Sequence, residues 1–92
     1  MMKTNKLETR KILRNFIINS FIKDNGAQLD DDLSFIDEGI IDSVGVLELV
    51  AFLETTFHLR VEDEELMPTN LDSVNRLVTF VESKIAKKLV SS

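Results

Sequence analysis

The stretch from Gly39 to Phe57 constrains the fold more than any other part of the chain. An apolar loop leads into Asp42-Ser43, and such residues before an apolar periodic run mark a helix start, because their side-chain oxygens accept free backbone amides. The sequence therefore predicts an amphipathic helix from Ser43, with the Ser43 hydroxyl exposed at its positive end. Its buried stripe follows from residues at helical spacing: Val46, Leu49, Val50, Leu53 and Phe57.

A serine at a helix start has two interpretations. Backbone N–H groups and the helix macrodipole favour a negative group there by about 0.3–1 kcal/mol when it is exposed, which suits a phosphate ester on Ser43. A serine at this position is also a common helix cap with no further role. The pattern by itself favours the cap.

The composition indicates one small domain. The 92 residues are 43% hydrophobic, enough for a single core, and we expect one domain over residues 1–92 with about 5–88 ordered and loose termini. The chain has no cysteine, which excludes disulfides and a thiol nucleophile. It lacks the run of roughly 18 apolar residues that a membrane span needs, and its basic start lacks the apolar core of a signal peptide. We therefore expect a soluble cytoplasmic monomer.

Charge is divided unevenly along the chain, whose net charge is −5. Residues 24–72 carry fourteen acids and one arginine, whereas residues 1–23 and 73–92 are both basic overall. The acidic block includes the start of the central helix, so this face should attract basic partners and repel nucleic acid. A solvated acidic face without a partner is the alternative.

The rest of the pattern predicts helices and no strand. Residues 4–24 form a first helix with Leu13, Phe16, Ile17 and Phe21 facing inward, and residues 25–42 form a long packed connection anchored by Phe35 and Ile36. A short acidic helix or turn from Glu62 to Met67 ends at Pro68, and Asn70 caps a last helix. The fold class is all-α: a small four-helix bundle with three long helices and one short helix.

Two other kinds of site find little support. Asp30-Asp31-Asp32 lacks the alternating acids, glycine and distal glutamate of a calcium-binding loop, so we interpret these residues as solvated acids. His58 is the only histidine and has no cysteine beside it, which makes a metal role improbable. A hydrolase using Ser43 lacks a base, since His58 lies roughly 20 Å away along the helix at 1.5 Å per residue. We expect neither a metal nor catalytic residues.

One side of the central helix carries residues that are not part of the predicted buried stripe. Apolar residues left exposed beside a reactive position suggest docking, although packing at the edge of the core is the alternative. Gly45 costs this helix about 1 kcal/mol relative to alanine, and we interpret it as keeping bulk away from Ser43. The residues on this side are Val44, Leu47, Glu48, Ala51 and Glu54.

The central region resembles the phosphopantetheine attachment region of acyl carrier proteins and peptidyl carrier domains. The resemblance rests on Gly39-Ile40-Ile41-Asp42-Ser43-Val44, followed by Glu48-Leu49-Val50, Leu53-Glu54 and Phe57. It extends through Leu66-Met67-Pro68 and the helix expected from Leu71 to Val81. Asp72-Ser73-Val74 repeats the central triplet without the preceding apolar loop, so we interpret Ser73 as a structural residue in the first turn of the last helix.

The resemblance implies a carrier that performs no chemistry alone. A phosphopantetheinyl transferase would move the arm from coenzyme A to Ser43, and the arm's thiol would hold an acyl or aminoacyl group as a thioester. Partner enzymes that load and accept this cargo would present basic patches to the carrier. By the same resemblance, they would meet Asp42, Val44, Leu47, Glu48, Ala51 and Glu54.

One departure concerns the pathway. Many fatty-acid carriers have an acid two residues after the serine, where this chain has Gly45, and the acidic helix face is sparser here. Both features favour a specialised stand-alone carrier, such as one for a secondary metabolite or an aminoacyl group. The rival hypothesis is an unmodified helical interaction module with the same fold.

Overall fold

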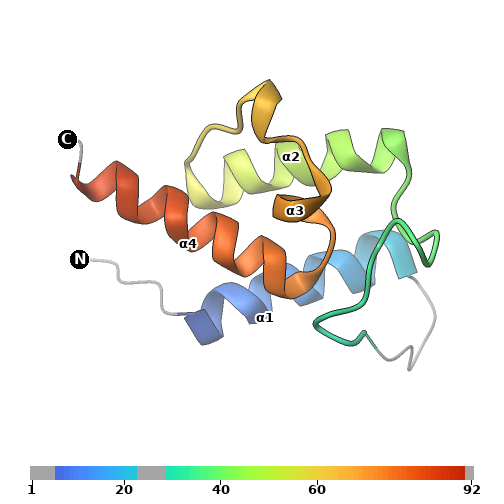
Figure 1. The fold of residues 1–92 in the computed structure, drawn as a ribbon. Coiled ribbons are helices and arrows are strands. Elements are labelled where there is room, and N and C mark those ends of the chain that lie inside the picture. Colours follow the sequence, from blue (N-terminus) through green and yellow to red (C-terminus); the bar gives the residue numbers. More distant parts are fainter. Residues whose placement is uncertain (1–5, 23–28, 91–92) are drawn as a thin grey trace.

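A computed structural model describes residues 6–22 and 29–90, which form an all-helical bundle (Figure 1). The predicted fold class, with three long helices and one short helix, is confirmed for these residues. Every helix in this part of the chain is too short or too polar to cross a lipid bilayer. The elements are α1 (Lys6–Ile17), a π-helical turn (Ile18–Ile22), α2 (Ser43–Phe57), a 3₁₀ turn (Asp63–Glu65), α3 (Pro68–Leu71) and α4 (Val74–Val90).

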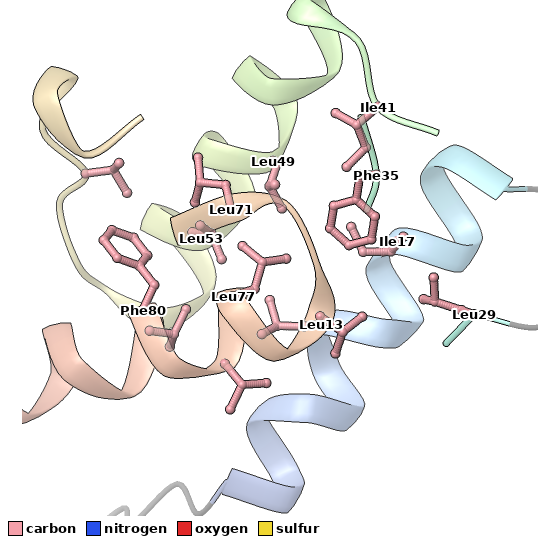
Figure 2. Close-up of a cluster of buried hydrophobic side chains, with 14 residues drawn as sticks. Leu13, Ile17, Leu29, Phe35, Ile41, Leu49, Leu53, Leu71, Leu77 and Phe80 are labelled. Carbon is pink, nitrogen blue, oxygen red and sulfur yellow. The ribbon is translucent and has the colours of Figure 1, made fainter. Parts of the chain in front are cut away.

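The core lies where α1, α2 and α4 face one another. α1 packs along α4, and the short α3 packs on α4 at the side that faces α2 (Figure 1). Figure 2 shows the buried side chains that meet there, among them Leu13 of α1, Leu53 of α2 and Leu77 of α4, each fully buried. Burying each such leucine stabilises the fold by about 1.5–3 kcal/mol relative to leaving it exposed.

α2 has the predicted bounds and the predicted stripe. Leu49 and Leu53 are buried, and Val46, Val50 and Phe57 are partly buried against the core. α2 also contacts α1 through aromatic rings, since Phe52 stacks on Phe16 with centroids 3.9 Å apart. This contact joins the last turn of α1 to the second half of α2.

The first helix departs from its predicted form. α1 changes to a π-helical turn after Ile17, so the segment up to Ile22 is helical but not α-helical throughout. The end predicted at residue 24 lies outside the described residues. Leu13 and Ile17 are buried as predicted, and Phe16 and Phe21 are partly buried against the core.

The prediction that Asn70 begins the last helix is wrong, because the chain breaks at Asp72-Ser73 and α4 begins at Val74. The short helix is therefore α3, with Pro68 at its first turn, where the missing proline N–H is no loss. Asn70 lies inside α3, and its Nδ2 donates to the Glu65 carbonyl. The sequence does not reveal this break, because the helical spacing of apolar residues continues across it: Leu71, Val74, Leu77, Val78 and Val81.

The prediction that Asp30-Asp31-Asp32 are solvated acids is wrong for Asp31. Its carboxylate pairs with Arg10 at 2.9 Å and Arg14 at 2.6 Å, and its carbonyl accepts the Asn75 amide. Asp30 and Asp32 are exposed, but the Asp32 carboxylate accepts from the Asn75 side chain. The acidic segment thus ties the connection between α1 and α2 to both α1 and α4.

The segment between α2 and α3 is held by two glutamates. Glu54 of α2 accepts the Val61 amide through Oε2 at 2.8 Å. The Glu65 carboxylate accepts the Glu62 amide and pairs with Lys84 of α4 at 2.9 Å, and these two contacts hold the pKa of the Glu65 carboxyl below its ordinary value. The short acidic element predicted from Glu62 to Met67 is a 3₁₀ turn confined to Asp63–Glu65.

Candidate functional site

Ser43 is the first residue of α2 and is exposed. The cap is supplied by Asp42, whose extended backbone precedes the helix and whose Oδ1 accepts the Gly45 amide at 2.8 Å. Within the described residues the Ser43 hydroxyl makes no hydrogen bond. Ser43 is therefore not needed as the cap, and its hydroxyl is available to react at the positive end of a fifteen-residue helix.

Gly45 is explained by close packing beneath the helix and not by the predicted need for space beside Ser43. It is buried in the first turn of α2. A Cβ placed there would lie 3.0 Å from Cγ2 of Ile41 and 3.0 Å from Cε1 of Phe21. The π-helical turn and the end of the preceding loop thus both press against the first turn of α2.

The loop before Ser43 is fixed from the side of α3 and α4. Asp72 accepts from the Ser34 hydroxyl and, through Oδ1, from the Ile36 amide at 2.9 Å, while its carbonyl accepts the Phe35 amide. The Ile40 amide then bonds back to the Phe35 carbonyl at 2.8 Å, across a turn in which Gly39 has a φ of +68°. Asp72 therefore holds the turn that delivers the chain to Ser43.

A small apolar pocket lies between this loop, α2 and α3. Its volume is about 100 Å³, and Asp72 is the one acid in its lining. Phe35 forms a buried wall, whereas Met67 is partly exposed at the rim. The pocket is also lined by apolar residues of α2 and α3: Val46, Leu49 and Leu71.

Large apolar side chains are exposed around this pocket and beside Ser43. Val44 and Leu47, predicted as part of a docking face, are 65% and 64% exposed. Ile36 is 54% exposed, so the prediction that it anchors the connection is wrong. Phe35 is 1% exposed, which confirms the same prediction for Phe35. Leu66 and Met67 are also exposed and were not predicted for this surface. We call Ile36, Val44, Leu47, Leu66 and Met67 the apolar surface.

The other predicted contact residues divide into two groups. Asp42, Glu48 and Ala51 are exposed, as is Ser43. Glu54 is half-buried, and its carboxylate is occupied by the Val61 amide. The acids exposed on this side of α2 are thus Asp42 and Glu48, fewer than the charge count of the sequence indicated.

Ser73 occupies an environment opposite to that of Ser43. It is 3% exposed, and its Oγ accepts the Arg76 amide, which caps α4. It lies just before α4, and not in the first turn as predicted, but the interpretation of Ser73 as structural is confirmed. The same three-residue motif therefore gives one exposed hydroxyl and one buried cap.

His58 lies at the far end of α2 from Ser43. It is the C-cap residue, with left-handed φ and ψ of 55° and 48°. Within the described part of the chain, no three side chains of the metal-binding types come together. Among residues 6–22 and 29–90, no side chain is hydrogen-bonded to the Ser43 hydroxyl as a general base would be.

The geometry at Ser43 agrees with a family comparison. The family model described as "Phosphopantetheine attachment site" matches residues 16–81, which include the loop, α2, α3 and the first half of α4. This chain belongs to the phosphopantetheine-attachment family of carrier proteins. Such a domain is where 4′-phosphopantetheine is attached covalently.

Curated relatives of this carrier are named for one amino acid. It is similar to the D-alanyl carrier protein of Streptococcus suis (strain 05ZYH33), with 28% identity over 75 residues that cover 82% of this chain and 92% of that protein. It is also similar to the D-alanyl carrier protein of Streptococcus pyogenes serotype M5 (strain Manfredo), with 36% identity over 62 residues. This second match covers 67% of this chain and 76% of that protein.

The described residues fit a covalently attached phosphopantetheine arm. The carrier supplies an exposed hydroxyl at a helix start, where a phosphodiester is electrostatically favoured. It has no cysteine, so any thiol for cargo must come from the arm. Val44 and Leu47, which follow Ser43 on α2, are exposed apolar residues.

Proposed function

We propose that this chain is a stand-alone aminoacyl carrier, with 4′-phosphopantetheine on Ser43 and D-alanine as its cargo. The exposure of the Ser43 hydroxyl at the start of α2, within the family match, is the observation that supports this most. The names of the curated relatives support the choice of cargo. An acyl cargo of another specialised pathway is the alternative.

Attachment is a phosphoryl-type transfer to Ser43. The Ser43 oxygen attacks the phosphorus that bears the pantetheine in coenzyme A, and the bond from that phosphorus to the adenosine bisphosphate breaks. The serine proton passes to a base of the transferase, because no described side chain of the carrier is hydrogen-bonded to the Ser43 hydroxyl. The attached arm supplies a thiol that holds the cargo as a thioester.

The carrier itself is not an enzyme in this proposal. Its partners are a phosphopantetheinyl transferase, a ligase that loads the cargo and an enzyme that accepts it. We place it in the cytoplasm, where coenzyme A is available to the transferase, and as a monomer. No nucleic acid is involved, since the exposed side chains beside Ser43 are apolar or acidic.

Partner enzymes meet the carrier on the apolar surface together with Asp42, Glu48 and Ala51. Val44, Leu47 and Glu48 lie within five residues of Ser43 on α2 and are exposed, so an enzyme that reaches the Ser43 hydroxyl is expected to contact them. Glu54 contributes less than its neighbours, because its carboxylate already accepts the Val61 amide. An aliphatic partner surface edged by basic side chains fits this arrangement.

Replacing Leu47 with serine should raise the KM for the transferase about tenfold, because removing an exposed leucine from a contact costs on the order of 1.4 kcal/mol of binding. The value of kcat should change little, since Leu47 does not touch the hydroxyl that reacts. Leu7→Ser is the matched control, because Leu7 is 77% exposed on α1 and lies outside the proposed contact. Equal KM values for the two variants would remove Leu47 from the docking surface.

Loading with D-alanine tests the proposed function. The chain is incubated with coenzyme A, magnesium and a broad-specificity transferase, then with ATP, D-alanine and an ATP-dependent ligase that activates D-alanine. Intact mass should show one phosphopantetheine and then one D-alanyl group, which hydroxylamine removes because a thioester is labile to it. An arm that accepts acyl groups but no D-alanine would favour the acyl alternative, and a chain that gains no arm would favour an unmodified interaction module.

A further inference from the structure

We infer that Gly45 and Phe21 form a positioning pair that sets where the first turn of α2, and with it Ser43, stands relative to the bundle. This inference rests on the proposed attachment at Ser43. Gly45 is two residues after Ser43 and faces inward, whereas Ser43 faces solvent. A change in the packing under Gly45 is therefore passed directly to the residue that reacts.

The packing under Gly45 leaves no room for a side chain. A Cβ at Gly45 would meet Cε1 of Phe21 and Cγ2 of Ile41, both at 3.0 Å, and Oδ1 of Asp42 at 3.4 Å. The first two distances are below ordinary van der Waals contact, so either these side chains or the turn of α2 must move by a few tenths of an ångström. Gly45 thus permits a close approach that any other residue would prevent.

The Phe21 ring is braced from behind, which restricts how far it can yield. Phe16 meets it edge to face, with centroids 5.7 Å apart and an interplanar angle of 84°. Phe16 in turn stacks on Phe52 in the second half of α2, with centroids 3.9 Å apart. The three rings form a continuous chain of contacts from the first turn of α2, through Phe21 and Phe16, to Phe52 of α2. Phe21 therefore cannot move away from Gly45 without disturbing its contact with Phe16.

The backbone that carries Phe21 is unusual. Ile18–Ile22 is a π-helical turn, a rare conformation that widens the helix and often lies at functional sites. An α-helical continuation of α1 would present residue 21 at a different angle. The π-helical turn and the α-helical Gly45 therefore meet at one contact, between the Phe21 ring and the first turn of α2.

The Asp42 cap makes the reacting residue sensitive to this contact. Oδ1 of Asp42 accepts the Gly45 amide, and Ile41, which also touches Gly45, precedes the cap. Moving the first turn outward therefore carries Asp42 and Ser43 with it. Attack by the Ser43 oxygen on phosphorus requires close alignment, and a misplacement of about 1 Å can cost about 100-fold in rate.

Gly45→Ala should lower kcat for phosphopantetheine attachment about tenfold, because a displacement of a few tenths of an ångström affects alignment in the transferase. KM should stay within about twofold, since the apolar surface that the transferase holds is unchanged. The measurement is the initial rate of attachment at varied carrier concentration, with coenzyme A, magnesium and a broad-specificity transferase. Circular dichroism should show helicity unchanged, because alanine favours a helix more than glycine does.

Rescue separates a positioning role from a general packing role. In the Gly45→Ala background, Phe21→Leu removes the ring atom that collides, and kcat should return to within about threefold of wild type. Phe21→Leu alone should lower kcat about threefold, because the turn loses its support. Phe16→Leu in the same Gly45→Ala background is the comparison and should restore kcat less than Phe21→Leu does, since it loosens the support behind Phe21 but leaves the colliding ring atom beside Gly45.

Three results would overturn the inference. They are a Gly45→Ala chain with wild-type kcat, a rescue by Phe16→Leu equal to that by Phe21→Leu, and a double variant with Phe21→Leu that is no better than Gly45→Ala alone. If Gly45→Ala does not fold, a double variant that folds and is modified supports the pair, and one that stays unfolded contradicts it. Failure of the wild-type chain to gain an arm would instead contradict the proposed function.

Discussion

Replacing Ser43 with alanine will abolish phosphopantetheine attachment, and replacing Ser73 with alanine will leave it intact. Both serines follow an aspartate and precede a valine, so the comparison holds the local sequence constant. Only Ser43 is exposed at the start of a long helix, whereas Ser73 is 3% exposed and accepts the Arg76 amide. Intact mass after incubation with coenzyme A, magnesium and a transferase measures the difference.

The free energy of unfolding should respond to the two substitutions in the reverse order, with Ser73→Ala having the larger effect. Ser43→Ala should leave the free energy of unfolding nearly unchanged, because Asp42 caps α2 and the Ser43 side chain is exposed. Ser73→Ala should lower it by about 0.5–2 kcal/mol, the usual cost of losing a cap. An arm on Ser43→Ala, or a folded Ser73→Ala chain that takes none, would contradict the assignment of the site to Ser43.

The sequence predicts α2 well because two independent signals agree there. The Asp42-Ser43 start and the inward spacing of Val46, Leu49 and Leu53 are both local, so they need no knowledge of the rest of the fold. The break between α3 and α4 was missed for the same reason. Asp72 is held by the Ser34 hydroxyl and the Ile36 amide, groups more than thirty residues away that no local pattern contains.

The charge count of the sequence does not separate acids that face solvent from acids that have structural partners. The fourteen acids of residues 24–72 suggested an acidic docking face, but several of them have structural partners. Asp31 pairs with Arg10 and Arg14, and Glu65 pairs with Lys84. Such pairs join distant parts of the chain, and a sequence gives no measure of which acids will find them. Most of the described acids in residues 24–72 are nevertheless exposed, Asp42 and Glu48 beside Ser43 among them.

The exposed part of the apolar surface depends on tertiary packing in the same way. Leu66 and Met67 are exposed, although the neighbouring Glu65 ties this segment to Lys84 of α4. Gly45 also depends on tertiary packing, since the need for a glycine there comes from its contact with Phe21 on another helix. A local signal could have marked Gly45 as unusual in a helix, but not the contact that requires it.

Phe35→Ala should lower the free energy of unfolding by about 3–5 kcal/mol, the usual cost of removing a buried phenylalanine. Phe35 is 1% exposed and forms a wall of the pocket between the loop, α2 and α3. A chain of this size has about 5–10 kcal/mol of stability in total, so the variant should be close to unfolding at 37 °C. Urea denaturation followed by circular dichroism measures the loss.

Ile36→Ala is the matched control, because the Ile36 side chain is 54% exposed. The hydrogen bond from its backbone N–H to Asp72 does not depend on that side chain. Its stability should fall within about 0.5 kcal/mol of wild type, the usual range for a surface substitution. Equal losses from the two substitutions would mean that the loop does not pack through Phe35. The outcome bears on function too, since a loop released from the core would no longer hold Asp42, and therefore Ser43, at the start of α2.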